Sequence, residues 1–379
     1  MISTAYKFMK YDKPKSIGII IGIVVSIFLI GQQLGILSFL TELMGGLIEN
    51  SRQEIGQIWV VDKITQNANE LPQLDERLVR EIRSIEGVQD TYSIIAANAS
   101  VKFANGKVAP ILLIGSESPV FAGGPRKEKI NGGSILTLND EGAVSAEFYD
   151  ESIFNNKVDV GTRVEINGKS AFIKLQTKNA RGFAGSFFYT TLSKARYFSS
   201  FPDSKISAVA VKVKPGYEIK QVVKNINSVI YGVKAWDAQE FKNTTIRFIT
   251  ISSNIGLSVG SLVVFALISG FFIIGLTLYS ASLDRIKDYG TLKAIGATNG
   301  YVSKLILTQS FLFAIIGFII ALLLLAGFKK GVSNTGLIIT FSFIKVITLF
   351  LITVFISVGG SFFAIRKINT VEPASVFRG

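Results

Sequence analysis

The stretch Asp284-Arg-Ile-Lys-Asp-Tyr-Gly-Thr-Leu-Lys-Ala-Ile-Gly-Ala-Thr298 is a short charged segment between two long apolar runs. Residues 248–283 before it and 305–328 after it contain no Asp, Glu, Lys or Arg. The hydrocarbon core of a bilayer is crossed by about 20 helical residues. Each run is therefore long enough to cross a membrane, and the charged segment is predicted to be a loop on one side of it.

Two more charge-free runs, 16–41 and 346–365, are also long enough to span. Hydrophobic residues make up 49% of the 379, charged residues only 18%, and the mean hydropathy is +0.43. We expect four transmembrane helices, at 16–41, within 251–283, at 305–328 and at 341–365. The first exceeds the apolar core of a signal peptide, roughly 7–15 residues, so we interpret it as an uncleaved anchor. Residues 1–15 are predicted to form an interfacial helix with Ile2, Tyr6 and Met9 on one face, or else a frayed basic tail.

Basic residues near the spans predict the orientation. Eleven lie on one side: Lys7, Lys10, Lys13, Lys15, Arg285, Lys287, Lys293, Lys304, Arg366, Lys367 and Arg378. The short loop at 329–340 has only Lys329 and Lys330. Both termini (1–15 and 366–379) and the 284–304 loop are therefore expected in the cytoplasm, and residues 42–250 outside. That outer block holds 26 of the 40 basic and 23 of the 27 acidic residues, so most of the net charge of +13 flanks the membrane. This distribution favours contact with lipid headgroups and argues against nucleic-acid binding.

The outer block has a β-α-β-β pattern at its start and a β-α-β pattern at its end. Strands are expected near 58–61, 91–103, 108–115, 208–213 and 232–236, and helices at 73–86 and 218–231. One α/β lobe is thus predicted from 50–115 and 206–245, with a mostly β insertion at 116–205. Asn105-Gly106 and Asn167-Gly168 are predicted hairpin turns.

The 36-residue run at 248–283 would measure about 54 Å as one helix, well beyond the roughly 30 Å core. Its first part carries Ser252, Ser253 and Asn254. We interpret it as one continuous helix whose polar part projects outward as a stalk. The alternative is a loop followed by an ordinary span.

Several kinds of chemistry are excluded or disfavoured. The chain has no Cys and no His, which excludes disulfides, Cys/His metal sites and His-based triads. Gly168-Lys169-Ser170 resembles the end of a phosphate-binding loop, but Arg163 stands where that loop requires glycine. No Asp, Glu, Lys or Arg lies inside a confident span, with Lys345 at the edge of the fourth, which argues against an ion-coupled carrier. We therefore expect no catalytic, cofactor or metal-binding residues. Three G-x-x-x-G pairs are candidate helix contacts: Gly18/Gly22, Gly31/Gly35 and Gly256/Gly260.

This topology resembles the FtsX/MacB/LolC-type permeases, the membrane subunits of mechanotransmitting (type VII) ABC transporters. The resemblance rests on Asp288-Tyr-Gly-Thr-Leu-Lys-Ala-Ile-Gly-Ala-Thr298 and on a tail that includes Ala364-Ile-Arg-Lys-Ile and Glu372-Pro-Ala-Ser-Val-Phe-Arg378. Tyr289 and the Pro-Ala-x-x-Phe ending look most similar to the DevC branch. Asp288 stands where the family more often has Glu.

The resemblance implies an α-helical membrane protein with an extracytoplasmic α+β domain, namely a Porter-like lobe with an inserted Sabre-like lobe. It implies that ATP and Mg bind in a separate ABC ATPase, which docks on the 284–298 loop. The coupling residues would be Arg285, Ile286, Asp288, Tyr289, Gly290, Thr291, Leu292, Lys293, Ala294, Ile295 and Gly296. We expect Ile286, Tyr289, Leu292 and Ile295 to form an apolar docking stripe, and Gly290 and Gly296 to allow close approach.

A permease of this kind would export a substrate from the bacterial inner membrane. It would work as a homo- or heterodimer, with a periplasmic adaptor and an outer-membrane channel. The alternative function is an FtsX-like signalling scaffold that activates a cell-wall hydrolase, although such proteins have smaller outer domains. A membrane enzyme is a third class, for which the sequence offers no catalytic constellation.

Overall fold

The computed structural model describes residues 2–370 apart from 12, 184 and 334–335. The chain divides into two compact units. The membrane unit comprises 1–38, 256–333 and 337–379, and the α+β unit comprises 39–255 and 334–336. The tail motif at 372–378 lies outside the described residues.

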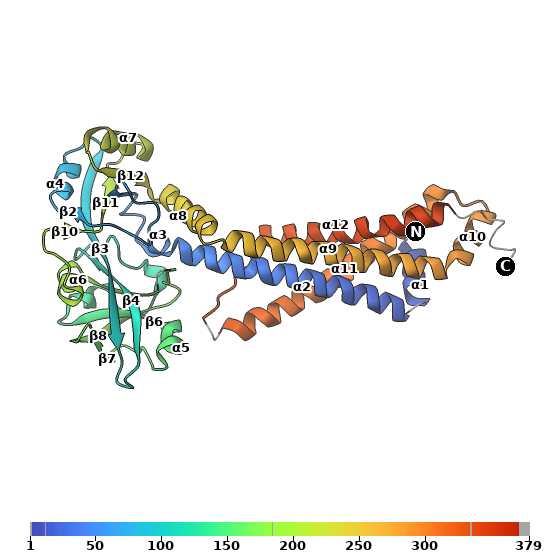
Figure 1. The fold of residues 1–379 in the computed structure, drawn as a ribbon, viewed down its shortest axis with the longest axis horizontal. Coiled ribbons are helices and arrows are strands. Elements are labelled where there is room, and N and C mark those ends of the chain that lie inside the picture. Colours follow the sequence, from blue (N-terminus) through green and yellow to red (C-terminus); the bar gives the residue numbers. More distant parts are fainter. Residues whose placement is uncertain (1, 12, 184, 334–335, 371–379) are drawn as a thin grey trace. The chain divides into compact units, whose positions relative to one another are not determined.

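In the described part of the chain, four helices are long and apolar enough to cross a membrane, which agrees with the four predicted spans. They are α2 (Lys13–Met44), α9 (Ile255–Asp284), α11 (Asn299–Ser333) and α12 (Phe343–Asn369). The short helices α1 (Ile2–Tyr11) and α10 (Ile286–Ala294) lie together at one end of them (Figure 1).

The membrane helices share one apolar core, with Ile23 and Ile27 from α2, Ile274 from α9, Leu305 from α11 and Ile356 from α12. Hydroxyl groups inside this core have partners. Ser357 Oγ donates to Ser310 O at 2.8 Å and so joins α12 to α11. A hydroxyl that bonds a backbone oxygen avoids the cost of an unpaired polar group in an apolar interior.

The predicted continuous helix through 248–283 is wrong. Helix α8 (Ala238–Ser252) ends at Ser252, inside this run, and α9 starts at Ile255. Between the two helices, Asn254 has a left-handed φ of 56°. Ser252 Oγ and Ser253 Oγ both donate to Ile249 O, so the serines bond the end of α8. Asn tolerates the left-handed conformation that commonly ends a helix. Helix α8 is also not a free stalk, because Phe241, Thr245 and Ile249 are buried in the α+β unit.

The central sheet of the α+β unit confirms that both ends of the outer block form one lobe. β1 (Ile58–Asp62) pairs with β11 (Ala208–Val213) and β12 (Val233–Asp237), and β11 pairs with β3 (Val88–Lys102), all antiparallel. Side chains of β1 alternate, with Ile58 and Val60 on one face and Trp59 and Val61 on the other. Helices α4 (Leu78–Arg83) and α7 (Ile219–Val229) contribute to the core of the first face, while α3 (Gly46–Asn50) and α8 contribute to that of the second.

The insertion is mostly β, as predicted. Its strands are β5 (Ile130–Gly133), β6 (Ala143–Glu147), β7 (Arg163–Ile166), β8 (Lys169–Thr177) and β9 (Ser186–Thr191). Helices α5 (Glu151–Phe154) and α6 (Leu192–Ser199) and three single turns, Lys127–Lys129, Ile135–Asn139 and Phe148–Asp150, accompany them. The insertion joins the main sheet because β4 (Val108–Ser116) pairs with both β3 and β9.

The two predicted hairpin turns are confirmed. Asn105-Gly106 connects β3 to β4, and Asn167-Gly168 connects β7 to β8 with both residues at positive φ. The helix predicted at 73–86 is shorter than expected. Leu74–Asp75 instead forms β2, paired with β10 (Lys205–Ile206), and Asp75 Oδ1 accepts from Arg77 N before α4 begins. A short acidic side chain that bonds the backbone two residues on forms a turn instead of a helix.

Candidate functional site

Helix α10 lies between the ends of α9 and α11, and its own end is defined by backbone chemistry. Gly296 has a φ of 103° and its amide donates to Lys293 O at 3.0 Å, while Ala297 N donates to Leu292 O at 2.9 Å. These two bonds form a Schellman motif, which needs a left-handed residue at Gly296. Gly296 therefore ends α10, and the space around it is open.

The predicted apolar docking stripe is divided by the structure. Tyr289 is 2% exposed in the core of the membrane unit, and Gly290 is buried beside it. Ile286 and Leu292 are half-buried, whereas Ile295 is 77% exposed because it lies past the end of the helix. The sequence showed an apolar face at helical spacing but could not show that this chain's own core would cover most of it.

The outward face of α10 is mixed in chemistry. Asp288, Thr291 and Ala294 are exposed on the helix, followed by Ile295 and Gly296. Thr291 Oγ1 donates to Lys287 O at 2.9 Å. Because its hydroxyl group bonds the helix backbone, Thr291 presents mainly its methyl group on this face. Of the proposed coupling residues, Asp288, Thr291, Ala294, Ile295 and Gly296 are therefore the most available to a partner.

Contacts on both sides attach α10 to the other helices of the membrane unit. Asp284, at the end of α9, forms an ion pair with Lys15 near the start of α2. The Arg285 guanidinium lies 5.7 Å from the ring centre of Tyr11 in α1. Lys293 Nζ donates to Ile368 O at 2.7 Å at the end of α12. A displacement of α10 would therefore act on α1, α2, α9 and α12 together.

The apolar residues of the N-terminal helix differ in burial. Ile2 and Tyr6 are exposed, whereas Met9 is buried, and so is Ala5. The reason is the close packing of α1 against α11, which a small side chain at position 5 permits.

The glycine pairs differ in what they contact. A Cβ at Gly22 would lie 2.8 Å from Ile273, at Gly31 2.5 Å from Leu325, and at Gly35 2.7 Å from Ile339. Gly18 has one neighbour, Thr277, at 4.0 Å, and Gly260 has none within 4 Å. Gly22, Gly31 and Gly35 thus serve helix packing within one chain, whereas the Gly256/Gly260 pair has no such contact shown at Gly260.

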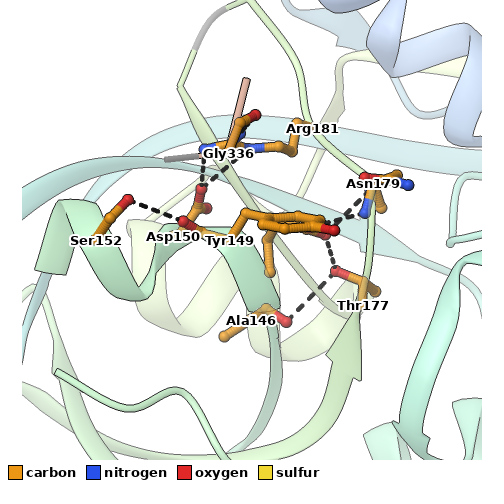
Figure 2. Close-up of polar contacts among 10 residues, drawn as sticks. Ala146, Tyr149, Asp150, Ser152, Thr177, Asn179, Arg181 and Gly336 are labelled. Carbon is orange, nitrogen blue, oxygen red and sulfur yellow. Dashed lines mark hydrogen bonds and ion pairs between the residues drawn. The ribbon is translucent and has the colours of Figure 1, made fainter. Parts of the chain in front are cut away.

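The α+β unit contains two buried carboxylates that the sequence did not single out. Glu147, at the end of β6, accepts hydrogen bonds from Thr177 Oγ1, Asn179 N and Ala180 N at 2.7–3.0 Å. Asp150 is 1% exposed and pairs with Arg181 (Figure 2). Burial raises the pKa of Glu147, and its three hydrogen bonds oppose that rise. Both carboxylates bond the chain itself, which indicates a structural use.

Asp75 and Glu76 are adjacent carboxylates that bond other parts of the α+β unit. Asp75 bonds Arg77 N, and Glu76 forms an ion pair with Arg196 at 3.0 Å. Among the described residues, no group of three or more His, Cys, Asp and Glu side chains is arranged to hold a metal ion.

Residues 260–373 match the family described as "FtsX-like permease C-terminal". Three solved structures are similar to the α+β part. The periplasmic region of MacB from Actinobacillus actinomycetemcomitans is 15% identical, with a TM-score of 0.38, over 51% of this chain and 94% of that one. The extracellular domain of the noncanonical ABC-type transporter YknZ, from Gram-positive bacteria, is 13% identical, with a TM-score of 0.35, over 47% and 98%.

A domain of a permease-like protein from Porphyromonas gingivalis is 11% identical, with a TM-score of 0.33, over 49% and 91%. None of the curated proteins compared with this sequence matches it.

Proposed function

Because residues 260–373 match the FtsX-like permease family, we propose that this chain is the membrane subunit of an ABC export system. Membership of this family implies an ATPase partner and a second permease copy. ATP and Mg would bind in the ATPase, and this chain would be the non-catalytic subunit. The membrane would be the bacterial inner membrane, with both termini in the cytoplasm and the α+β unit in the periplasm.

The observation that supports this proposal best is the attachment of α10. Its buried side, Tyr289, lies in the same core as α11, and Lys293 and Asp284 connect the segment to α12 and α2. Its outward side presents Asp288, Thr291 and Ile295. A helix that is held on one side by other helices and exposed on the other is suited to dock in a partner and to pass on its displacement.

The proposed cycle begins when ATP binding brings two ATPase subunits together and moves the α10 segments. We expect α9 to move with α10, because Asp284 at the end of α9 and Arg285 join the two helices directly. Helix α8 precedes α9 in the chain and is joined to it through the break at Asn254. The α+β unit would then move on a cargo or an adaptor. The charge-free runs 16–41, 248–283, 305–328 and 346–365 contain no Asp, Glu, Lys or Arg, so the cargo need not pass through a polar path between the helices. An adaptor and an outer-membrane channel would complete the export route.

Purification of the full chain in mild detergent with a co-expressed ABC ATPase tests the proposal. Ile295→Asp introduces a charge on the exposed face and should reduce the retained ATPase at least about 10-fold, the scale of losing one central interface contact. Ile2→Asp is the matched control, since Ile2 is 67% exposed on α1 and outside α10. The proposal fails if no P-loop ATPase is retained, and also if Ile295→Asp and Leu292→Asp both leave the complex unchanged.

The same purification separates the alternatives. Retention of an elongated periplasmic adaptor supports export, whereas retention of a cell-wall hydrolase in its place would support the signalling scaffold. Hydrolytic activity of this chain alone would instead indicate a membrane enzyme.

A further inference from the structure

The loop between β8 and β9 is held in the α+β unit from its first residues. Glu147 accepts from Thr177 Oγ1 at 2.8 Å, Asn179 N at 2.7 Å and Ala180 N at 3.0 Å. Figure 2 shows Thr177 at the end of β8 and Asn179 on this loop, next to the helical turn that carries Asp150. The buried carboxylate therefore fixes the backbone just before Arg181.

Arg181 itself is fixed on both its backbone and its side chain. Asn50 Nδ2 donates to Arg181 O at 2.8 Å. Arg181 Nε and Nη2 both donate to Asp150 Oδ1, at 3.2 and 2.9 Å, and Asp150 is 1% exposed. A guanidinium is rigid and planar, so two bonds to one carboxylate determine where its third nitrogen lies.

That third nitrogen bonds a residue far away in the sequence. Arg181 Nη1 donates to Gly336 O at 2.6 Å (Figure 2). Gly336 is buried and has a φ of 80°, and a Cβ there would lie 2.5 Å from Arg181 Nη1. Both the left-handed backbone and the close guanidinium require glycine at this position.

Gly336 belongs to the α+β unit, as Arg181 does, but its neighbours in sequence do not. Ser333 ends α11 and Leu337 leads to α12, and both are part of the membrane unit. The connection between α11 and α12 thus enters the α+β unit only around Gly336. The other connections are α2, which runs unbroken past residue 38, and the α8–α9 junction.

We propose that Asp150 and Arg181 form a latch that holds the α11–α12 connection to the α+β unit through Gly336. The latch fixes this connection within the α+β unit, to which Gly336 itself belongs. A hydrogen bond to a single backbone oxygen can open without unfolding either helix. The connection between α11 and α12 can therefore be released from the α+β unit when the bond from Arg181 to Gly336 O opens.

Hydrogen–deuterium exchange on the full chain in detergent tests the latch without any ATPase. Arg181→Met removes the bond to Gly336, and amides within 329–342 should exchange about 10-fold faster or more, as expected from loss of a charge-assisted hydrogen bond. Arg196→Met is the matched control. Arg196 is half-buried in the same unit and ion-paired with Glu76, but it does not contact Gly336. It should leave exchange in 329–342 unchanged.

Gly336→Ala is a second variant that keeps the Asp150–Arg181 pair while displacing its partner. It should accelerate exchange in the same peptide, and trypsin should cut faster after Lys329 and Lys330 in both variants. The latch is contradicted if Arg181→Met and Gly336→Ala both fold with the wild-type melting temperature and show wild-type exchange in 329–342. This result is independent of whether an ATPase binds α10, so it separates failure of the latch from failure of the proposed function.

Discussion

Lys293 Nζ donates to the backbone oxygen of Ile368 at 2.7 Å, and so a residue of α10 bonds the last turn of α12. A cation is favourable at a helix C-terminus, where the final backbone oxygens have no partner within the helix. Lys293 thus serves this chain's own packing, although the sequence suggested it for the partner interface.

Lys293→Met should loosen the end of α12. Loss of a hydrogen bond to a charged donor should cost about 1–2 kcal/mol, or roughly 2–6 °C in melting temperature. Exchange in 364–370 should rise while exchange in the α+β unit stays the same. Lys287→Met is the control, because Lys287 is exposed on the same helix. Equal effects from the two substitutions would contradict a specific role for Lys293.

Gly31→Val should destabilise the membrane unit. Its first side-chain atom would meet Leu325 at 2.5 Å in a packed core, and overpacking typically costs about 1–3 kcal/mol. Gly260→Val is the matched substitution at a position with open space, and it should leave the melting temperature of the monomer unchanged. Thermal unfolding in detergent compares the two. Similar melting curves for both variants would show that the Gly31 contact does not matter.

The break between α8 and α9 should depend on the left-handed residue. Asn254 has a φ of 56°, which costs a β-branched residue about 1–2 kcal/mol and costs glycine nothing. Asn254→Ile should therefore lower the melting temperature or force the two helices toward one, whereas Asn254→Gly should keep the break. Spin labels at one exposed site in each helix measure the distance between them, and the absence of native cysteine makes each label unique. An identical distance distribution in Asn254→Ile would contradict this account.

Glu147 should make the α+β unit more stable as the pH falls, which is the opposite of the usual effect of a carboxylate in an ion pair. Burial raises the pKa of this carboxyl above its ordinary value of 4.5. The folded state then takes up its proton at a higher pH than the unfolded state. Protonation of Glu147 therefore adds to the free energy of unfolding. This stabilisation is complete below about pH 4.5, the ordinary pKa, and is lost as the pH rises through the raised pKa of the folded state.

Glu147→Gln cannot titrate, so the stability advantage of the wild type over this variant should widen as the pH falls from 7 to 4.5. Fluorescence reports the correct unit, since Trp59 and Trp236 are the only tryptophans and both lie in it. Glu165→Gln, on β7, serves as the control. A constant difference across this pH range would contradict a raised pKa.

The sequence predicted the spans and the split lobe well because each depends on local signals. Charge-free runs longer than the bilayer core define helices, and Asn-Gly pairs between alternating strands define hairpins. The break at Asn254 was missed because Ser252 and Ser253 looked like a polar helix face, although their hydroxyls bond the end of α8.

The site was less predictable, since burial depends on partners that are distant in sequence. The apolar spacing of Ile286, Tyr289 and Leu292 was correct, but only the packing of α11 and α2 determines that Tyr289 lies inside. No local pattern in the sequence marks Glu147 and Asp150 as buried. Their burial depends on Thr177 and Arg181, about 30 positions later in the chain. The DevC-like assignment and the docking role of α10 stay predictions.

The length of β3 limits how the two lobes of the α+β unit can move. This single strand pairs with β11 through Ile94 and with β4 from Ile94 to Lys102, so it runs through both lobes of the α+β unit (Figure 1). Ile94 of this strand lies in an apolar core that both lobes share, with Trp59 and Phe241 from one lobe and Leu138 and Phe187 from the other. A jaw that opened between these lobes would have to break a strand. We therefore expect the two lobes of the α+β unit to move as one solid piece.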